Sequence, residues 1–278
     1  EKMAAKPLQL DQQKQLLGMV RNEGKRLAKK LALQQQDLQH AENAEEYRQK
    51  ADTLMANLWS IAKGAKSCIL DNIYDGAPLQ IDLNAALTPN DNAQNYYKKY
   101  AKLKRAKTEI AKQIAATQEE ARYLGEIENS LTLVLTREEV EEIKQELQNA
   151  GYIRKPKGKK ASQPLSQPMK IQLADGIIYI GKNNRQNDLV TFRYAKANDL
   201  WFHTKDIPGS HVVLIGEQSE ANIQKARMLA VRYSKAKGGS NVPVDMVQRK
   251  YVKKPSGAKP GFVIFTNNTT SYVTDEVD

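Results

Sequence analysis

Two long stretches with no internal proline and very little glycine constrain the fold of this chain most. The first runs from about Leu10 for some fifty residues, and the second from Thr88-Pro89 to about Leu131. In both, apolar residues return with the 3-4 spacing of a heptad, which is typical of a helix with one narrow apolar stripe. Neither stripe can be buried alone, so we expect the two helices to pair as an antiparallel coiled-coil hairpin.

The predicted seam alternates between two positions of the heptad on each helix. On the first helix these are Leu17, Gly24, Leu31 and Leu38, alternating with Val20, Leu27, Gln34 and Ala41. On the second they are Leu103, Ile110, Thr117, Leu124 and Leu131, alternating with Tyr100, Lys107, Ile114 and Ala121. Gly24 and Gln34 weaken the first seam without erasing it.

Shorter elements are expected around the coiled coil, which we assign to residues 1–135. A small β insert at about 66–87 is predicted from Asp75-Gly76, a hairpin turn signal between the apolar runs Cys68–Tyr74 and Pro78–Leu83. Residues 136–153 should form a short helix at the base, because Thr136 and Glu139 have the spacing of a capping box.

Residues 154–168 are basic and rich in Pro, Ser and Gln, which predicts a flexible linker before a separate domain at 169–278. Short strands and a helix opened by Ser219 and closed by Gly238 predict an α+β fold there. Asp188 is expected to cap a further helix ending near Ala197. The predicted strands are Ile171–Leu173, Ile177–Ile180, Leu200–Thr204, Val212–Ile215, Val242–Val252, Phe262–Thr266 and Ser271–Thr274.

Charge limits the classes of partner. The chain has 43 Lys and Arg residues and 32 Asp and Glu residues, which gives a net charge of +11. A surface with this positive charge should attract nucleic acid or a membrane surface. The single cysteine, Cys68, excludes an internal disulfide and a thiolate metal cage. No stretch approaches the roughly 20 apolar residues of a membrane span, and no signal peptide precedes the first helix, which predicts a cytosolic protein. Because Glu1 is not an initiator methionine, we expect the chain to be a fragment.

The first candidate site is a polar run after a strand-ending glycine, Gly181. Its amides and charges offer donors and acceptors to phosphates and base edges. The alternative is a polar turn that ends in a helix cap. The run comprises Lys182, Asn183, Asn184, Arg185, Gln186, Asn187 and Asp188.

The second candidate region spans two adjacent predicted strands and comprises Asp199, Trp201, His203, Gly209, Ser210 and His211. Leu200 and Phe202 should share one face of their strand, with Trp201 and His203 on the other, so that one aromatic ring is core and the other is free to stack on a base. Gly209 suggests a close backbone approach to a ligand, and we expect at least one histidine to face it. The alternative is that both histidines are structural.

Neither known metal-binding spacing nor a nucleophile elbow is present in this second region, so we assign no metal, cofactor or catalytic residue.

The third candidate is a basic loop between two strands that carries Lys253, Lys254 and Lys259. Such lysines would make salt-sensitive phosphate contacts, and the alternative is a solvated hairpin tip. We expect the polar run and the basic loop to form one RNA-facing surface.

Several of these motifs, in order, resemble the NFACT-R domain. They are GKNNRQND at 181–188, DLWFH at 199–203, GSHV at 209–212, VPVD at 242–245 and KKPSGAKPG at 253–261. The coiled coil, including Asn57-Leu58-Trp59, is similar to the middle region of the same family. The resemblance covers essentially the whole chain and indicates a ribosome quality-control factor of the NFACT family, whose Gram-positive members are also labelled fibronectin- or fibrinogen-binding proteins.

This resemblance implies binding to the large ribosomal subunit and tRNA in the cytoplasm, and support of untemplated C-terminal alanine tailing of stalled chains. Peptide-bond chemistry would then belong to the ribosome, so the chain itself would not be an enzyme. The competing hypothesis is an adhesin at the cell surface that binds host fibronectin or fibrinogen. The sequence leaves the oligomeric state open.

Overall fold

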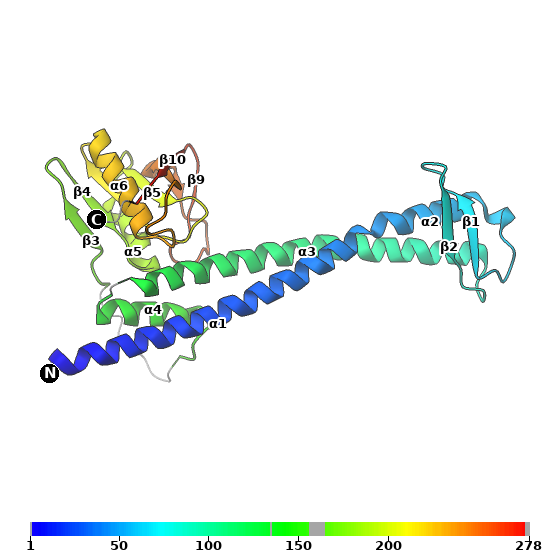
Figure 1. Cartoon of the computed structure of the whole chain (residues 1–278), viewed down its shortest axis with the longest axis horizontal. Coiled ribbons are helices and arrows are strands. Elements are labelled where there is room, and N and C mark those ends of the chain that lie inside the picture. Colours follow the sequence, from blue (N-terminus) through cyan, green and yellow to red (C-terminus); the bar gives the residue numbers. More distant parts are fainter. Residues whose placement is uncertain (1, 134, 156–164, 276–278) are drawn as a thin grey trace. The chain divides into compact units, whose positions relative to one another are not determined.

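The computed structural model describes residues 2–133, 135–155 and 165–275, and the side chains from residue 9 onward. Residues 156–164 of the predicted linker lie outside this description. The chain divides into two compact units, one formed by residues 26–119 and the other by residues 1–25 with 120–278. The long helices α1 (Lys2–Glu42) and α3 (Pro89–Thr132) contribute to both units (Figure 1). The α+β class predicted from the sequence is confirmed.

In the unit formed by residues 26–119, α1 and α3 pair antiparallel along the predicted seam. Leu27, Gln34 and Ala41 are buried on α1, and Thr117 is buried on α3. Lys107 is the exception, because its side chain is exposed and its Nζ lies 3.6 Å from Glu42 Oε1. A lysine placed in the seam by its spacing thus lies at the rim, where its charge stays hydrated and paired.

The first helix is shorter than expected. It is interrupted at Asn43 and continues as α2 (Ala44–Ala56), which is followed by the short 3-10 helix η1 (Leu58–Ser60). Asn57 ends α2 because its side-chain Nδ2 donates to the carbonyl of Thr53 at 2.9 Å, a local bond that competes with helix continuation.

The β insert is a two-stranded antiparallel hairpin, β1 (Ser67–Asp71) and β2 (Pro78–Asp82). Its core is formed by buried Ile81 together with Leu54 of α2 and Ala93 of α3. The first strand ends three residues earlier than expected, because the connection folds back at Gly76, whose φ of +72° suits glycine.

In the other unit, the beginning of α1 packs along the end of α3. Gln13 Nε2 donates to the carbonyl of Leu131 at 2.8 Å, and Arg21 Nε lies 3.0 Å from Glu128 Oε1. The short helix α4 (Arg137–Asn149) follows, and its capping box between Thr136 and Glu139 is present as predicted.

The C-terminal domain is built on a six-stranded antiparallel sheet with the order β10-β7-β5-β6-β4-β3. Its strands are β3 (Met169–Gln172), β4 (Gly176–Ile180), β5 (Leu200–Thr204), β6 (Val212–Gly216), β7 (Val242–Gln248) and β10 (Thr269–Val273). After β7 the chain forms a 3-10 turn, η3 (Arg249–Tyr251), and a short ribbon of β8 (Val252–Lys253) and β9 (Ile264–Phe265).

Both faces of this sheet are covered, which follows from the alternation along β5. Leu200 and Phe202 pack with α6 (Glu220–Arg232), while Trp201 packs on the opposite face with Val190 and Val252. The predicted sharing of faces is correct. The expectation of an exposed ring is wrong, because Trp201 and Phe202 are both fully buried.

The helix expected to start at Asp188 begins earlier. Asn183 is the N-cap of α5 (Asn184–Leu189), which runs directly into a π-helical segment, η2 (Val190–Tyr194). Together they cover the Trp201 face, and we call them the α5–η2 helix. At the other face, α6 ends at Arg232, before Gly238. Among the described residues, no helix has a stretch long and apolar enough to cross a bilayer.

The seam gives a direct test of the coiled coil. Leu27→Ala should lower the free energy of unfolding by about 2–5 kcal/mol, because it removes a buried side chain that is 1% exposed. Leu33→Ala on the same helix is the matched control, since Leu33 is 63% exposed and its change should stay within about 0.5 kcal/mol. Urea denaturation measures both, and equal effects would contradict the seam.

Candidate nucleic-acid interface

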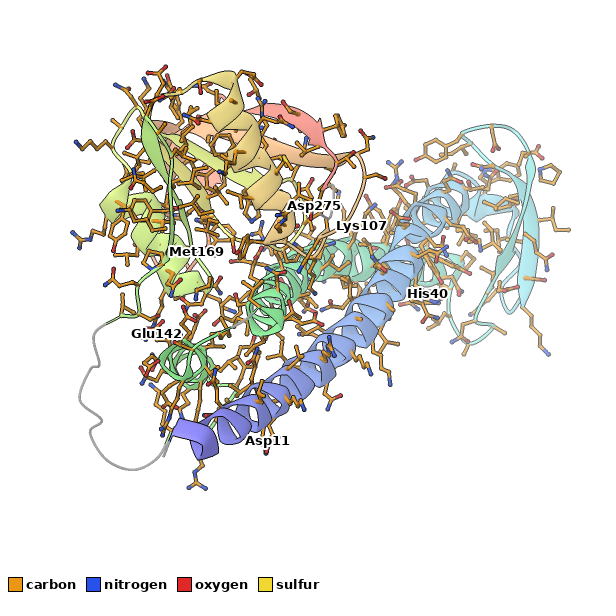
Figure 2. All side chains as sticks on the ribbon, turned by 60° about the vertical axis from the view of Figure 1, so that its left-hand side comes forward. Asp11, His40, Lys107, Glu142, Met169 and Asp275 are labelled. Atoms are coloured by element: carbon orange, nitrogen blue, oxygen red, sulfur yellow. The ribbon has the colours of Figure 1, made fainter. Side chains whose placement is uncertain are left out.

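Three glutamates on one face of α4 hold the polar run. Their spacing of three and four residues aligns them along the helix, and each accepts a hydrogen bond from a different side-chain amide. The pairs are Glu139 with Gln186 (3.1 Å), Glu142 with Asn183 (2.9 Å) and Glu146 with Asn184 (2.9 Å). Figure 2 shows α4, with Glu142 labelled, below the start of the sheet at Met169. The base of the coiled coil and the C-terminal domain are therefore joined by charge-assisted hydrogen bonds.

These contacts change the interpretation of the polar run. Asn183, Asn184, Gln186 and Asn187 are each 3% exposed or less, and Lys182 Nζ lies 2.5 Å from Glu139 Oε1. The amides expected to meet RNA are thus occupied inside the protein. The physical reason is that buried carboxylates need donors, and the amides and lysine supply them.

The pKa of Glu146 records how deeply this junction is buried. Burial raises it to about 7, although hydrogen bonds from Asn184 and Tyr123 and the charge of Arg185 act in the opposite direction. The carboxyl group therefore titrates near neutral pH, with Arg185 as the nearby cation of the polar run.

The polar run and the basic loop lie together, as the sequence predicts. Asp188 accepts hydrogen bonds from Lys254 Nζ and from the backbone N–H of Gly261, the latter at 3.2 Å. Gly261 has a φ of +78°, and a Cβ at this position would lie 2.5 Å from Asn184 Oδ1, so only glycine fits.

The remaining predicted lysines lie on the same loop. Lys253 is exposed on β8, and Lys259 is half-buried with its Nζ 4.1 Å from the centroid of the Tyr123 ring. That distance is typical of a cation–π contact, which fixes Lys259 at the edge of this surface.

The two histidines pack against each other and against Trp201. His211 is 3% exposed, and its Nδ1 lies 2.8 Å from Thr191 Oγ1, which also accepts from Trp201 Nε1 at 3.2 Å. His203 stacks on Trp201, and its Nε2 lies 3.2 Å from the carbonyl of Gly209. Burial lowers the pKa of both rings, so both are neutral at pH 7. Both rings thus have partners inside the protein, contrary to the expectation that one faces a ligand.

The close approach expected at Gly209 is made to the protein itself. A Cβ there would lie 2.8 Å from Ser234 Cβ, and the Gly209 N–H donates to Glu126 Oε2 at 2.8 Å. Ser210 is buried, with its N–H bonded to the carbonyl of Tyr233 at 3.0 Å. Asp199 accepts from the backbone N–H of Lys196 at 2.6 Å and so shapes the turn before β5.

Burial also raises the pKa of Glu126, to about 8, and the Gly209 N–H and the charges of Arg122 and Lys235 only partly offset this.

In the part of the chain that the structure describes, no group of three or more His, Cys, Asp or Glu could hold a metal ion.

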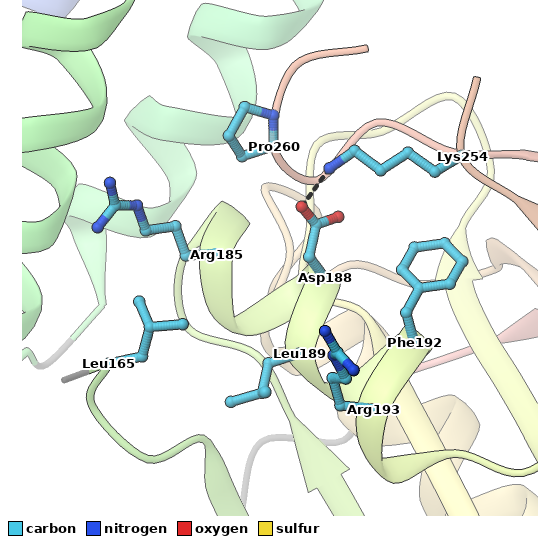
Figure 3. Close-up of a pocket in the computed structure, with 8 residues that line it drawn as sticks. All are labelled: Leu165, Arg185, Asp188, Leu189, Phe192, Arg193, Lys254 and Pro260. Atoms are coloured by element: carbon cyan, nitrogen blue, oxygen red, sulfur yellow. Dashed lines mark hydrogen bonds and ion pairs between the residues drawn. The ribbon is translucent and has the colours of Figure 1, made fainter. Parts of the chain in front are cut away.

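An open hollow of about 580 Å³ lies between the α5–η2 helix and the basic loop. Eight residues line it: Leu165, Arg185, Asp188, Leu189, Phe192, Arg193, Lys254 and Pro260. In Figure 3, Leu165 and Arg185 lie at the left, Phe192 and Lys254 at the right, and a dashed line marks the pair of Lys254 with Asp188. We call this feature the α5–η2 hollow.

Sequence reasoning found only part of this hollow. It singled out Arg185, Asp188 and Lys254 but missed Phe192 and Arg193. A signal was present, because the helical lining residues fall at i, i+3, i+4, i+7 and i+8 from Arg185 onward and so form one stripe. That stripe mixes charged and apolar side chains, whereas a purely apolar stripe would be buried.

The chain thus combines a coiled-coil hairpin with an α+β domain that carries a cationic hollow. The comparisons agree. The family described as NFACT N-terminal and middle domains matches residues 2–165, and the family described as NFACT protein RNA binding domain matches residues 169–267.

Curated relatives and a solved structure extend these matches. The Rqc2 homolog RqcH of Bacillus subtilis is 40% identical over 264 residues, and that of Streptococcus pneumoniae serotype 2 is 40% identical over 273 residues. The alignments cover 92% and 95% of this chain but 46% and 48% of the relatives. The solved C-terminal part of the fibronectin/fibrinogen-binding protein from Streptococcus suis has a TM-score of 0.74 at 34% identity, covering 96% of this chain and 95% of that one.

The chain belongs to the NFACT family. It spans about half the length of the curated relatives it matches.

The raised pKa of Glu126 predicts a pH dependence of stability. The pKa of its carboxyl group rises from 4.5 in the unfolded chain to about 8 in the folded protein, so between these pH values the folded state holds a proton that the unfolded state has released. The free energy of unfolding should therefore fall as the pH rises from 4.5 to 8. Glu126→Gln keeps an acceptor for Gly209 but cannot ionise, so its stability relative to the parent protein should increase from pH 5 to pH 8.5. Chemical denaturation at both pH values measures this difference. A difference that stays constant would show that the carboxyl group does not titrate in this range.

Proposed function

We propose that the α5–η2 side of the C-terminal domain binds RNA. The observation that carries this proposal is that the side chains of Arg185 and Arg193 form no ion pair or hydrogen bond with any other residue that the structure describes. On the α6 side the arrangement differs, because several cations there are already paired with carboxylates. These pairs are Arg227 with Glu220 (3.0 Å), Arg232 with Asp275 (3.1 Å) and Lys235 with Glu128 (2.5 Å).

Unpaired cations favour a phosphate partner for a simple electrostatic reason. A guanidinium that forms no ion pair or hydrogen bond has its donors free for an incoming anion, and it can bind a phosphate through two parallel hydrogen bonds. Each phosphate neutralised also releases a condensed counterion, which strengthens binding at low salt.

The relatives favour a particular RNA. Since the matched relatives are named as Rqc2 homologs, we propose that this chain is part of a ribosome-associated quality-control factor acting in the cytoplasm. In this role it binds the large ribosomal subunit and tRNA and supports untemplated C-terminal alanine tailing of stalled chains. The ribosome supplies the chemistry, and the chain binds and positions RNA without being an enzyme.

Residues 26–119 offer a second contact surface for the same assembly. Trp59 on η1 is 86% exposed, and Ile69 on β1 is 71% exposed. An exposed tryptophan is a common anchor at protein interfaces, so this surface fits a contact with the subunit that is separate from the cationic hollow.

The alternative is an adhesin, and its support is the name of the Streptococcus suis protein whose solved part this chain resembles. An acidic host protein would be attracted by the same net charge of +11. Such attraction depends on overall charge rather than on the hollow, and this difference makes the two functions separable.

Co-sedimentation with large ribosomal subunits over a salt series tests the proposed function. Arg185→Ala combined with Lys253→Ala should weaken binding and reduce the dependence of log K on log salt by about one per lost phosphate contact. The matched control is Lys225→Ala combined with Lys237→Ala, which removes the same charge from exposed positions on and just after α6.

The control variant should bind like the parent protein. If both double variants weaken binding equally, overall charge rather than the α5–η2 side governs it. Saturable binding to fibronectin, unaffected by either double variant and absent for ribosomal subunits, would favour the adhesin.

A further inference from the structure

The α5–η2 hollow has an aromatic ring that is fixed in place. The guanidinium carbon of Arg249 lies 5.1 Å from the centroid of the Phe192 ring, and Arg249 Nε donates to the carbonyl of Thr191 at 3.0 Å. The ring is half-buried, packs on the Trp201 face of the domain and also lines the hollow. The guanidinium of Arg249 therefore contacts the Phe192 ring from one side, while the ring also lines the hollow.

The backbone around this ring is unusual. Residues Val190–Tyr194 form a π-helical segment, and such segments are rare and concentrate at functional sites. The segment continues the stripe of α5, so that Leu189, Phe192 and Arg193 line one space. Apolar surface and positive charge thus alternate along a single helical face that no other described element fills.

The lining of the hollow mixes charged and apolar side chains. Arg185 and Arg193 are the first and last residues of the stripe along the chain, and Lys254 of the basic loop pairs with Asp188. Three cations against one carboxylate leave the hollow with an excess of positive charge. Its volume of about 580 Å³ lies within the range of about 300–1,000 Å³ that is typical of small-molecule sites.

We infer that the α5–η2 hollow binds one unstacked nucleotide of a single-stranded RNA segment. The base packs against Phe192 and Leu189, and the flanking phosphates contact Arg185 and Arg193. Asp188 and Lys254 offer an acceptor and a donor to the edge of the base or to the ribose. Base stacking on an aromatic ring and cationic phosphate contacts are the two interactions that hold single strands on proteins.

A duplex cannot make this contact, since its bases are stacked and their faces are not exposed. The inference rests on the proposed RNA-binding function, but it adds a preference that phosphate contacts alone do not give. Single-stranded RNA should be bound more tightly than a duplex of equal charge, and the excess should depend on Phe192.

The test uses the full chain with a fluorescent single-stranded RNA hexamer and a duplex RNA. Phe192→Leu keeps an apolar side chain against the core but removes the ring, and it should weaken hexamer binding by about 5-fold or more while leaving duplex binding unchanged. Tyr272→Leu is the matched control, because Tyr272 is an aromatic residue on β10 that is 66% exposed and outside the hollow. Its binding to both RNAs should equal that of the parent protein.

A second measurement does not depend on a variant. A hexamer with one 5-iodouracil, irradiated in complex with the parent protein, should cross-link within residues 185–193, as mapped by mass spectrometry. Cross-links only elsewhere would overturn the inference.

The outcomes separate the inference from the function on which it rests. If the parent protein binds both RNAs and Phe192→Leu changes neither, the nucleotide site is wrong and the RNA-binding surface stands. If the parent protein binds neither RNA at low salt, both proposals fail. Equal affinity for a poly-glutamate peptide, lost in Phe192→Leu, would instead assign the hollow to acidic peptides and overturn the inference.

Discussion

The hydrogen bonds between three α4 carboxylates and three amides of the polar run are the interactions on which the candidate interface depends. Glu139, Glu142 and Glu146 are each 7% exposed or less, so each needs a hydrogen-bond donor to offset the cost of removing its carboxylate from water. The amides of the polar run meet that need, and in doing so they fix the start of α5. The position of the α5–η2 helix, and with it the cationic hollow, follows from this junction.

The sequence predicted the periodic parts of the fold well. The seam through Leu27 and Ala41, the capping box at Thr136 and the alternation of Trp201 and Phe202 depend on spacings within one element, which local patterns contain. The amides of the polar run are different, because their partners on α4 lie about forty residues earlier in the chain. A run of Asn and Gln in isolation indicates a ligand site or a turn, and only the fold brings buried carboxylates to it.

The candidate site shows the same limit. Arg185 and Lys254 were found because they lie in conspicuous polar and basic runs. Phe192 and Arg193 were missed because the stripe that they form with Arg185 mixes charged and apolar side chains, and the π-helical segment that carries them has no simple sequence signature. The histidines were overinterpreted because their own strands do not reveal what covers them. The residues that pack around Trp201, which contacts His211, come from other parts of the chain.

The two faces of the sheet therefore differ in how their cationic side chains are paired. On the α6 side, Arg227, Arg232 and Lys235 are paired with carboxylates of the same chain, whereas on the α5–η2 side two arginine side chains form no ion pair among the described residues. Hydrogen–deuterium exchange of the chain with and without stalled large ribosomal subunits tests this difference most directly. The account predicts protection in residues 185–194 and 250–261 and none in α6. Protection confined to α6, or none in the C-terminal domain, would contradict it.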